Sequence, residues 1–297
     1  PTEVVTTADI GGSSPTDNIK PYILNYYNTK GLTYLLLVGD RELMPTLISS
    51  HKSGEADPMY GYLSGSDSYP DIFVGRFSVE TESELETVVK KVLAYEKSTE
   101  SSSWVAMSVG IASNEGPGDD NEYDYQHIRH IRNDLLGYSY LNVGELYDGY
   151  QGGLDQSGNP TATDLSNLIN SGVGLINYAG HGSSTQLQTT GFSVSDIAGL
   201  SNVGKLPFII TVGCSVGDFG GKTCFAESWL RATSGSDPVG AIGTFMSSIA
   251  QLWAPPMSAQ DEVVDIITSQ LISRKRYSLG GIVTNGVMQM NDDYGEN

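Results

Sequence analysis

The feature that most constrains the fold of this 297-residue chain is an alternation of short apolar runs with segments of helical periodicity. Strands that alternate with helices pack as a parallel α/β sheet, because each helix returns the chain to the start of the next strand. We therefore predict a mostly parallel sheet flanked by helices. The apolar runs of strand length lie at residues 33–38, 71–77, 104–112, 173–178, 207–212 and 239–245.

Segments of helical periodicity separate these runs, and one of them carries a clear start signal. Thr81 and Glu84 have the spacing of a capping box, in which each side chain satisfies a backbone N–H of the other residue. The polar tract at residues 98–103 interrupts the pattern. It predicts the boundary between an N-terminal subdomain of residues 1–102 and a second subdomain of residues 103–297. The predicted helices lie at residues 17–28, 81–96, 124–136, 194–200, 224–232 and 258–272.

The charge of the chain limits its partners. It has 16 Lys and Arg against 35 Asp and Glu, which gives a net charge of −19. Such a surface repels phosphate backbones and anionic lipids, which argues against nucleic acids and membrane surfaces, and it attracts basic peptides and divalent cations. A solvated acidic surface is equally typical of secreted or salt-adapted proteins. No apolar run approaches the roughly 18–20 residues that span a bilayer, so we expect no membrane insertion.

Other sequence features favour a processed, extracellular protein. Residue 1 is Pro rather than Met, and we find no signal peptide. The 35 Gly and 17 Tyr residues are typical of extracellular proteins with many tight turns. We therefore expect a secreted or cell-surface protein. Its two cysteines, Cys214 and Cys224, are too few for a disulfide scaffold but leave a single bridge between them open.

Two chemically reactive side chains follow neighbouring strand runs. His181 comes after the run at 173–178 within Gly-His-Gly, and Cys214 comes after the run at 207–212 within Gly-Cys. The 33-residue gap between them holds one short helix, as a right-handed crossover between adjacent parallel strands requires. Both side chains are then expected at the carboxyl edge of one sheet, where open α/β sheets bind their ligands.

This pattern favours a catalytic pair but leaves other interpretations open. A cysteine needs only a nearby histidine to become a strong nucleophile near neutral pH, and the N–H of Gly182 is free to stabilise an oxyanion. A histidine after a strand is also commonly an ordinary polar residue, and a cysteine there is commonly a small buried hydrophobe. A metal site is disfavoured, because His51, His127 and His130 have no ligand spacing with cysteine; the latter two suit a solvated helix face.

At these residues the chain resembles the gingipain-type cysteine peptidases, and most closely the arginine-specific gingipains. The similarity runs over nearly the whole chain, with the histidine–cysteine spacing intact. The matching segments are NYAGHGS at 177–183, LPFI at 206–209, Cys214, GDF at 217–219, CFAE at 224–227, WAPPM at 253–257, QDE at 260–262 and GG at 280–281, with LTY at 32–34, LLVGD at 36–40 and FVGRFS at 73–78 upstream.

The resemblance implies a caspase-like α/β fold with two fused subdomains. It makes His181 and Cys214 the catalytic pair and Glu115 the acid that orients the histidine, with the N–H groups of Gly182 and Cys214 as the oxyanion hole. The family domain begins with an earlier strand and helix that this chain lacks, and it continues past Asn297. A further chain or segment is therefore expected to complete the sheet.

The resemblance also implies a pocket for a basic side chain. Asp124 matches the acid at the floor of the arginine pocket, where a carboxylate pairs with a guanidinium through two hydrogen bonds. Trp253 matches the aromatic residue that covers the pocket. The alternatives are a helix N-cap for Asp124 and plain core packing for Trp253. The loop after Glu115 is two residues shorter than in the arginine-specific pattern, which loosens the match at Asp124.

A structural calcium ion is the one cofactor that the resemblance implies. The matched ligands mix carboxylate and carbonyl oxygens, which calcium prefers. The alternative is a set of solvated turn acids. The ligands would be the carboxylates of Asp40, Asp67 and Asp71 and the carbonyls of Ser64 and Tyr69.

Three functions therefore compete. The first is a cysteine endopeptidase that cleaves proteins or peptides after basic residues, preferably Arg. The second is a sortase-like transpeptidase of the same family, which passes the acyl-enzyme to an amine instead of water. The third is a non-catalytic calcium-binding module, which predicts a decayed catalytic pair although both residues are present. The sequence favours the first function.

Overall fold

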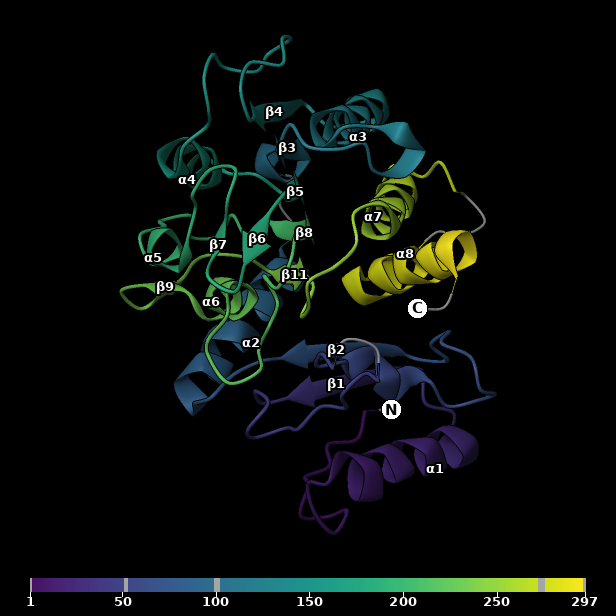
Figure 1. The fold of residues 1–297 in the computed structure, drawn as a ribbon. Helices are drawn as coiled ribbons and strands as arrows, with labels where there is room; N and C mark the ends of the chain where they lie inside the picture. Colours follow the sequence, from purple (N-terminus) through teal and green to yellow (C-terminus); the bar gives the residue numbers. More distant parts are fainter. Residues whose placement is uncertain (1, 51–52, 99–101, 272–275, 296–297) are drawn as a thin grey trace.

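A computed structural model describes residues 2–50, 53–98, 102–271 and 276–295. Its centre is a five-stranded parallel sheet in the order β11-β8-β5-β3-β4 (Figure 1). This sheet confirms the predicted parallel α/β fold with flanking helices. Its strands are β3 (Met107–Ala112), β4 (Asn142–Tyr147), β5 (Leu175–Ala179), β8 (Phe208–Val212) and β11 (Gly243–Phe245).

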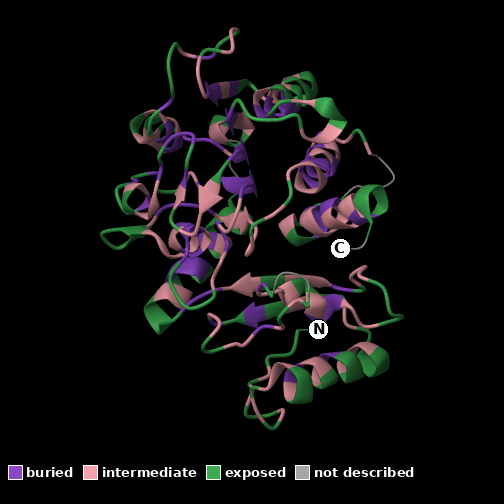
Figure 2. Cartoon of the chain, in the orientation of Figure 1, coloured by how far each residue is buried: buried purple, intermediate pink, exposed green. Residues whose placement is uncertain are grey.

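Helices cover both faces of this sheet, as the alternation of strands and helices predicts. On one face, α3 (Asp124–Tyr138) and α7 (Ala254–Ile267) pack against a core formed with the apolar side chains of the strands. The other face is covered by α4 (Ala162–Ser171), α5 (Val194–Ile197) and α6 (Phe225–Arg231). The buried residues in Figure 2 concentrate along the strands between these two layers.

The N-terminal part of the chain forms a second, smaller parallel sheet. Strand β1 (Tyr34–Val38) pairs with β2 (Phe73–Phe77), and Val38 lies opposite Phe77. Helix α1 (Lys20–Lys30) follows a π-helical turn (Pro15–Ile19) and shares an apolar core with this sheet. The C-terminal helix α8 (Leu279–Tyr294) contacts α7 and β2, and Figure 1 shows it beside the small sheet.

The remaining elements are short. The hairpin of β6 (Gly182–Ser183) and β7 (Gln186–Leu187) follows β5, and that of β9 (Thr233–Ser234) and β10 (Asp237–Pro238) follows α6. No helix of the described residues is long and apolar enough to cross a membrane. Short 3₁₀ turns of the described residues lie at Asp57–Gly61, Ser103–Ala106 and Asp119–Asn121.

Helix α2 (Glu82–Lys97) connects the two sheets and begins as predicted. Thr81 and Glu84 form the capping box, with the Glu84 N–H donating to Thr81 Oγ1 at 3.2 Å. The predicted boundary tract at 98–103 includes residues 99–101, which lie outside the described residues. The strand predicted from residue 104 begins only at Met107, because the chain first makes the 3₁₀ turn at Ser103–Ala106. Strand β4 was not predicted.

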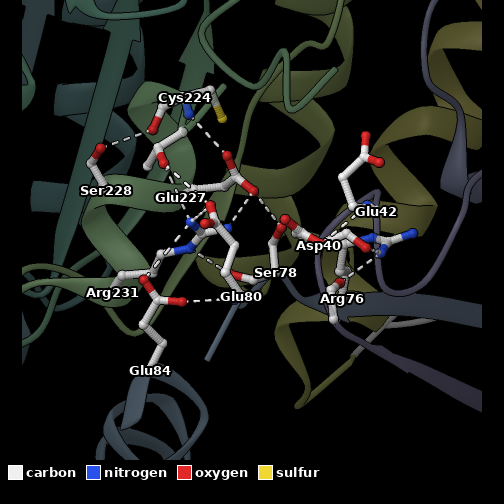
Figure 3. A network of polar contacts seen from close by, with 12 residues as sticks. Asp40, Glu42, Arg76, Ser78, Glu80, Glu84, Cys224, Glu227, Ser228 and Arg231 are labelled. Atoms are coloured by element: carbon white, nitrogen blue, oxygen red, sulfur yellow. Dashed lines mark hydrogen bonds and ion pairs between the residues drawn. The ribbon is translucent and has the colours of Figure 1, made fainter. Parts of the chain in front are cut away.

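A polar network, buried at Arg231 and Glu227, joins α6 to the segment that follows β2 (Figure 3). Arg231 donates to the Ser78 carbonyl at 2.9 Å and to the carboxylates of Glu80 at 2.6 Å and Glu227 at 2.7 Å. The Ser78 hydroxyl donates to Glu227 at 2.5 Å. The other oxygen of Glu227 accepts the N–H of Cys224 at 2.9 Å. This network holds the small sheet against the larger one.

Candidate active site

Cys214 lies at the carboxyl edge of the large sheet. It follows β8 after Gly213, and the next residue, Ser215, has a left-handed backbone with φ 56°. The chain therefore turns sharply at the strand end and leaves the cysteine partly exposed. Its thiol is free, and Sγ lies 3.9 Å from the carbonyl oxygen of Gln251.

His181 lies at the same edge, one strand away. It follows β5, which pairs with β8 so that Ala179 stands opposite Val212. The N–H of Gly180 donates to the Val212 carbonyl at 3.0 Å and extends the pairing past the strand end. A Cβ on Gly182 would lie 2.6 Å from Val216 Cγ1 and 3.1 Å from the carbonyl oxygen of Cys214, so glycine lets the two segments approach this closely. The segment after β5, which holds His181, therefore packs directly against the segment after β8, which holds Cys214.

The imidazole of His181 faces a carboxylate. Its Nε2 lies 3.5 Å from Glu115 Oε1, and both side chains are about half exposed. Glu115 comes from the loop after β3, the next strand in the sheet. The ring of Trp253 meets the His181 ring edge-on, with 5.1 Å between centroids. Thiol, imidazole and carboxylate therefore follow three adjacent strands, in the order that acid–base activation of a thiol requires.

Asp124 is the first residue of α3 and is completely buried. Its Oδ2 accepts the Ser113 hydroxyl at 2.5 Å, and its Oδ1 accepts the indole N–H of Trp253. Burial raises the pKa of Asp124, and these two hydrogen bonds oppose that rise. The alternative role of Asp124 as a helix N-cap is wrong, because Tyr123 occupies the N-cap and the carboxylate points to Ser113 and Trp253.

Trp253 precedes α7 and contacts both His181 and Asp124. Its ring packs partly against the core, as the packing alternative predicts, and its N–H donates to Asp124. A small pocket beside Cys214 is lined by Trp253 and by Gly180, Gly213 and Gln251. The indole N–H therefore occupies one oxygen of the Asp124 carboxylate.

The second cysteine lies in a different environment. Cys224 is buried and free at the start of α6, so the bridge to Cys214 that the sequence left open is absent. Burial raises the pKa of the Cys224 thiol to about 12, with the nearby charge of Glu227 as the next cause. A thiol with that pKa stays protonated and is a poor nucleophile.

The predicted calcium ligands do not come together as one set. Asp40 follows the end of β1, whereas Asp71 precedes the start of β2, and the two strands run parallel. The five-residue strands put these carboxylates at least about 13 Å apart. Ser64, Asp67, Tyr69 and Asp71 share one loop, in which Asp71 accepts the N–H of Ser64 at 2.8 Å and Asp67 that of Tyr69 at 3.1 Å.

The carboxylates also have protein partners. Asp40 accepts the N–H groups of Glu42 and Leu43, at 3.1 and 3.0 Å. Within the described residues, no group of three or more His, Cys, Asp or Glu side chains is arranged to hold a metal ion. The five-residue set therefore does not fit a single calcium ion.

One further expectation is wrong. His127, predicted on a solvated helix face, is buried against α7; Gln260 Oε1 lies 3.0 Å from its Nε2, and burial lowers its pKa to about 4. His130 does lie on the solvated face, next to Glu122. Sequence reasoning also missed Ser113. The only signal for it was a polar residue directly after β3, at the same sheet edge as His181 and Cys214.

Comparison with known proteins adds to this geometry. A family model described as Peptidase family C25 matches residues 1–297. Gingipain R2 of Porphyromonas gingivalis is 35% identical over 299 aligned residues, which cover 99% of this chain and 39% of that protein. Lys-gingipain of the same organism is 27% identical over 75% of this chain and 13% of its own length.

Solved structures agree with the sequence comparison. The crystal structure of the Arg-specific cysteine proteinase gingipain R has a TM-score of 0.90 to this chain at 34% identity, covering 97% of this chain and 66% of that one. A complex of the pro- and mature domains of a P. gingivalis gingipain has the same TM-score and identity, covering 99% of this chain and 68% of that one. The chain spans about two fifths of the length of Gingipain R2.

Proposed function

Because this chain belongs to peptidase family C25 and is homologous to the Arg-specific gingipains, we propose that it is the catalytic part of a secreted cysteine endopeptidase that cleaves after basic residues, preferably Arg. One observation carries the proposal. The free, partly exposed thiol of Cys214 follows the strand beside that of His181, whose imidazole faces Glu115 at 3.5 Å.

In the proposed reaction, the thiolate of Cys214 attacks the carbonyl carbon of the scissile bond and forms a C–S bond. The N–H groups of Gly182 and Cys214 donate to the oxyanion of the tetrahedral intermediate. His181 then protonates the leaving amine as the C–N bond breaks. A water molecule, deprotonated by His181, attacks the thioester, releases the acid and restores the thiolate. Glu115 stabilises the charged imidazole in both steps.

Specificity would come from Asp124. Its carboxylate is already desolvated, so a guanidinium that reaches it forms a stronger pair than it would in water. A planar guanidinium offers two parallel N–H groups to the two oxygens, whereas an ammonium offers a single point of charge. The indole of Trp253 must move aside for the guanidinium, and its flat ring can then stack on it.

Hydrolysis of a matched peptide panel tests this function. Fluorogenic peptides that differ only at the residue before the scissile bond, with Arg, Lys or a neutral residue, should be cleaved in that order of kcat/KM. Adding an amine nucleophile distinguishes the transpeptidase alternative, because a transpeptidase yields the amide and a hydrolase yields the acid. A panel in which no peptide is cleaved would favour the non-catalytic module.

We limit the calcium proposal to the loop of residues 64–71. Its two carboxylates, Asp67 and Asp71, and the carbonyls of Ser64 and Tyr69 keep the mixed oxygen chemistry that calcium prefers. Calcium bound there would stabilise the small sheet beside the loop, because a ligand that binds only the native state raises its stability. If metal-free protein melts at the same temperature with and without added calcium, this part of the proposal is wrong.

We also propose that a further segment of the protein covers β1. Tyr34, Leu36 and Val38 point to the same side of the strand and are all exposed. In the described residues β1 pairs with β2 alone, which leaves its outer edge open. An open strand edge offers unpaired N–H and C=O groups with which a further strand can pair. A longer form of the protein that includes preceding residues should therefore melt at a higher temperature than this chain.

A further inference from the structure

Ser113 is hydrogen-bonded to both acids of the proposed machinery and to the end of the strand that leads to His181. It directly follows β3 and is buried. Its hydroxyl donates to Asp124 Oδ2 at 2.5 Å and accepts the backbone N–H of Glu115 at 3.1 Å. Its own N–H donates to the carbonyl of Ala179, two residues before His181, at 2.9 Å.

These contacts close into a ring that links two acids. The N–H of Asp124 donates to the carbonyl of Glu115 at 2.9 Å, so the two residues are joined once through their backbones and once through the Ser113 hydroxyl. A hydroxyl is the smallest side-chain group that both donates to a carboxylate and accepts an N–H. Alanine at this position would leave the Asp124 oxygen and the Glu115 N–H without their partner.

We propose that Ser113 is a positioning residue, which holds the Asp124 carboxylate in place for a guanidinium and couples that carboxylate to the acid facing His181. The inference rests on the function proposed above. The Ser113 hydroxyl acts through Asp124 and Glu115 and does not itself touch the reacting atoms.

The charges around Asp124 support this role. Burial raises the pKa of Asp124, the hydrogen bonds from Ser113 and Trp253 lower it, Glu115 raises it and His181 lowers it. Removing the hydroxyl therefore raises the pKa of Asp124 further. The carboxylate then becomes protonated at a higher pH, and arginine binding is lost there.

The test compares Ser113→Ala with Ser108→Ala. Ser108 lies on β3, the strand that Ser113 follows, is equally buried, and donates its hydroxyl to the Leu175 carbonyl at 2.9 Å, away from the site. Ser113→Ala should lower kcat/KM for Arg peptides about ten- to hundredfold, mainly through KM, with little change for neutral peptides. The acid limb of the pH profile should move to higher pH for Arg peptides alone, and Ser113→Thr should restore part of the loss.

The outcomes separate this inference from the proposed function. If wild type prefers Arg peptides but Ser113→Ala matches Ser108→Ala in KM and in its pH profile, the inference is overturned and the function stands. If wild type cleaves no peptide or prefers neutral residues, both are overturned. Agmatine binding to Cys214→Ala with and without Ser113→Ala gives a readout without turnover, and equal affinities would also overturn the inference.

Discussion

The two cysteines of this chain lie ten residues apart and occupy opposite environments. Cys214 follows β8 between Gly213 and the sharp turn at Ser215, where its thiol is partly exposed at the same sheet edge as His181. Cys224 sits at the buried start of α6, where its N–H donates to Glu227 within a network of charged groups. A titratable neighbour alone therefore does not make a thiol reactive. Reactivity depends on whether solvent and substrate can reach the thiol, and on whether the neighbouring group is a base or an anion.

The two regions also use their charged groups differently. Around Cys214, the side chains of His181 and Glu115 are about half exposed and lie 3.5 Å apart, so their pairing contributes little to stability. Around Cys224, Arg231 and Glu227 are buried and bonded at 2.7 Å. We therefore expect substitutions in the first region to affect activity, and substitutions in the second to affect folding.

The largest effect should come from Cys214→Ala. Without the nucleophile, kcat should fall on the order of 10⁴–10⁶-fold for every peptide, whereas Cys224→Ala should keep at least half of the wild-type kcat. The measurement is hydrolysis of the preferred peptide at equal concentrations of folded protein. Alkylation of native protein followed by peptide mapping should label Cys214 only. Activity that survives Cys214→Ala, or that disappears in Cys224→Ala, would reverse the assignment.

The next largest effect should be on stability, from Arg231→Met. Methionine keeps the volume but leaves Glu227 charged and buried without its cation, which should cost about 3–5 kcal/mol in the free energy of unfolding. The matched control is Lys90→Met, which breaks the exposed pair of Lys90 and Glu86 and should cost at most about 0.5 kcal/mol. Urea unfolding measures both values.

Peptidase activity of the Arg231→Met variant shows whether the network also serves the active site. Folded Arg231→Met should cleave peptides with a kcat near that of wild type, because the network does not touch Cys214 or His181. A normal melting curve with lost activity would mean that the network serves the site rather than the fold.

Asp124→Asn should have an intermediate effect, confined to one class of substrate. The amide keeps the shape, but it has one acceptor oxygen where the carboxylate has two, and it loses the charge that pairs with a guanidinium. The kcat/KM for Arg peptides should fall by about tenfold to a few hundredfold, the equivalent of about 1.5–3 kcal/mol, and that for neutral peptides should change little. Peptide kinetics at fixed pH test this, and an equal loss for all peptides would place Asp124 in the fold rather than in specificity.

Much of this arrangement could be predicted from the sequence, for a physical reason. Apolar runs of strand length and a single short helix between His181 and Cys214 leave parallel, adjacent strands as the simple solution, and the structure has them. Strand β4 was missed because its residues alternate in burial only weakly. The burial of His127 depends on α7 packing over α3, which is a contact between distant segments that no local pattern encodes.

The finer parts of the site could not be predicted for the same reason. The five predicted calcium ligands do not form one site because Asp40 follows the end of β1 and Asp71 precedes the start of β2. The two strands are parallel, so these residues lie at opposite ends of the small sheet. Ser113 was missed because its role depends on which partners its hydroxyl meets. Its position after a strand is visible in the sequence, but the carboxylate of Asp124 reaches it only once α3 has folded back on β3.

The smallest effect on stability should come from Cys224→Ala, and its size should depend on pH because the thiol is buried. Removing a buried sulfur should cost about 1 kcal/mol in the free energy of unfolding at pH 7, whereas Cys214→Ala, at a partly exposed position, should stay within about 0.5 kcal/mol of wild type. The native pKa of Cys224 is raised from 9.0 to about 12, so the unfolded chain releases this proton at a lower pH than the native protein does.

The contribution of the neutral thiol is therefore complete below pH 9 and is lost as the pH rises from 9 toward 12. The alanine variant lacks this loss, so the stability gap between wild type and Cys224→Ala should narrow between pH 7 and pH 10. Urea unfolding of the two proteins at both values measures the gap, and lysine and tyrosine titration cancels in the difference. A gap that stays constant would show that the Cys224 thiol ionises as easily in the native protein as in the unfolded chain, and the contrast with Cys214 would then rest on access alone.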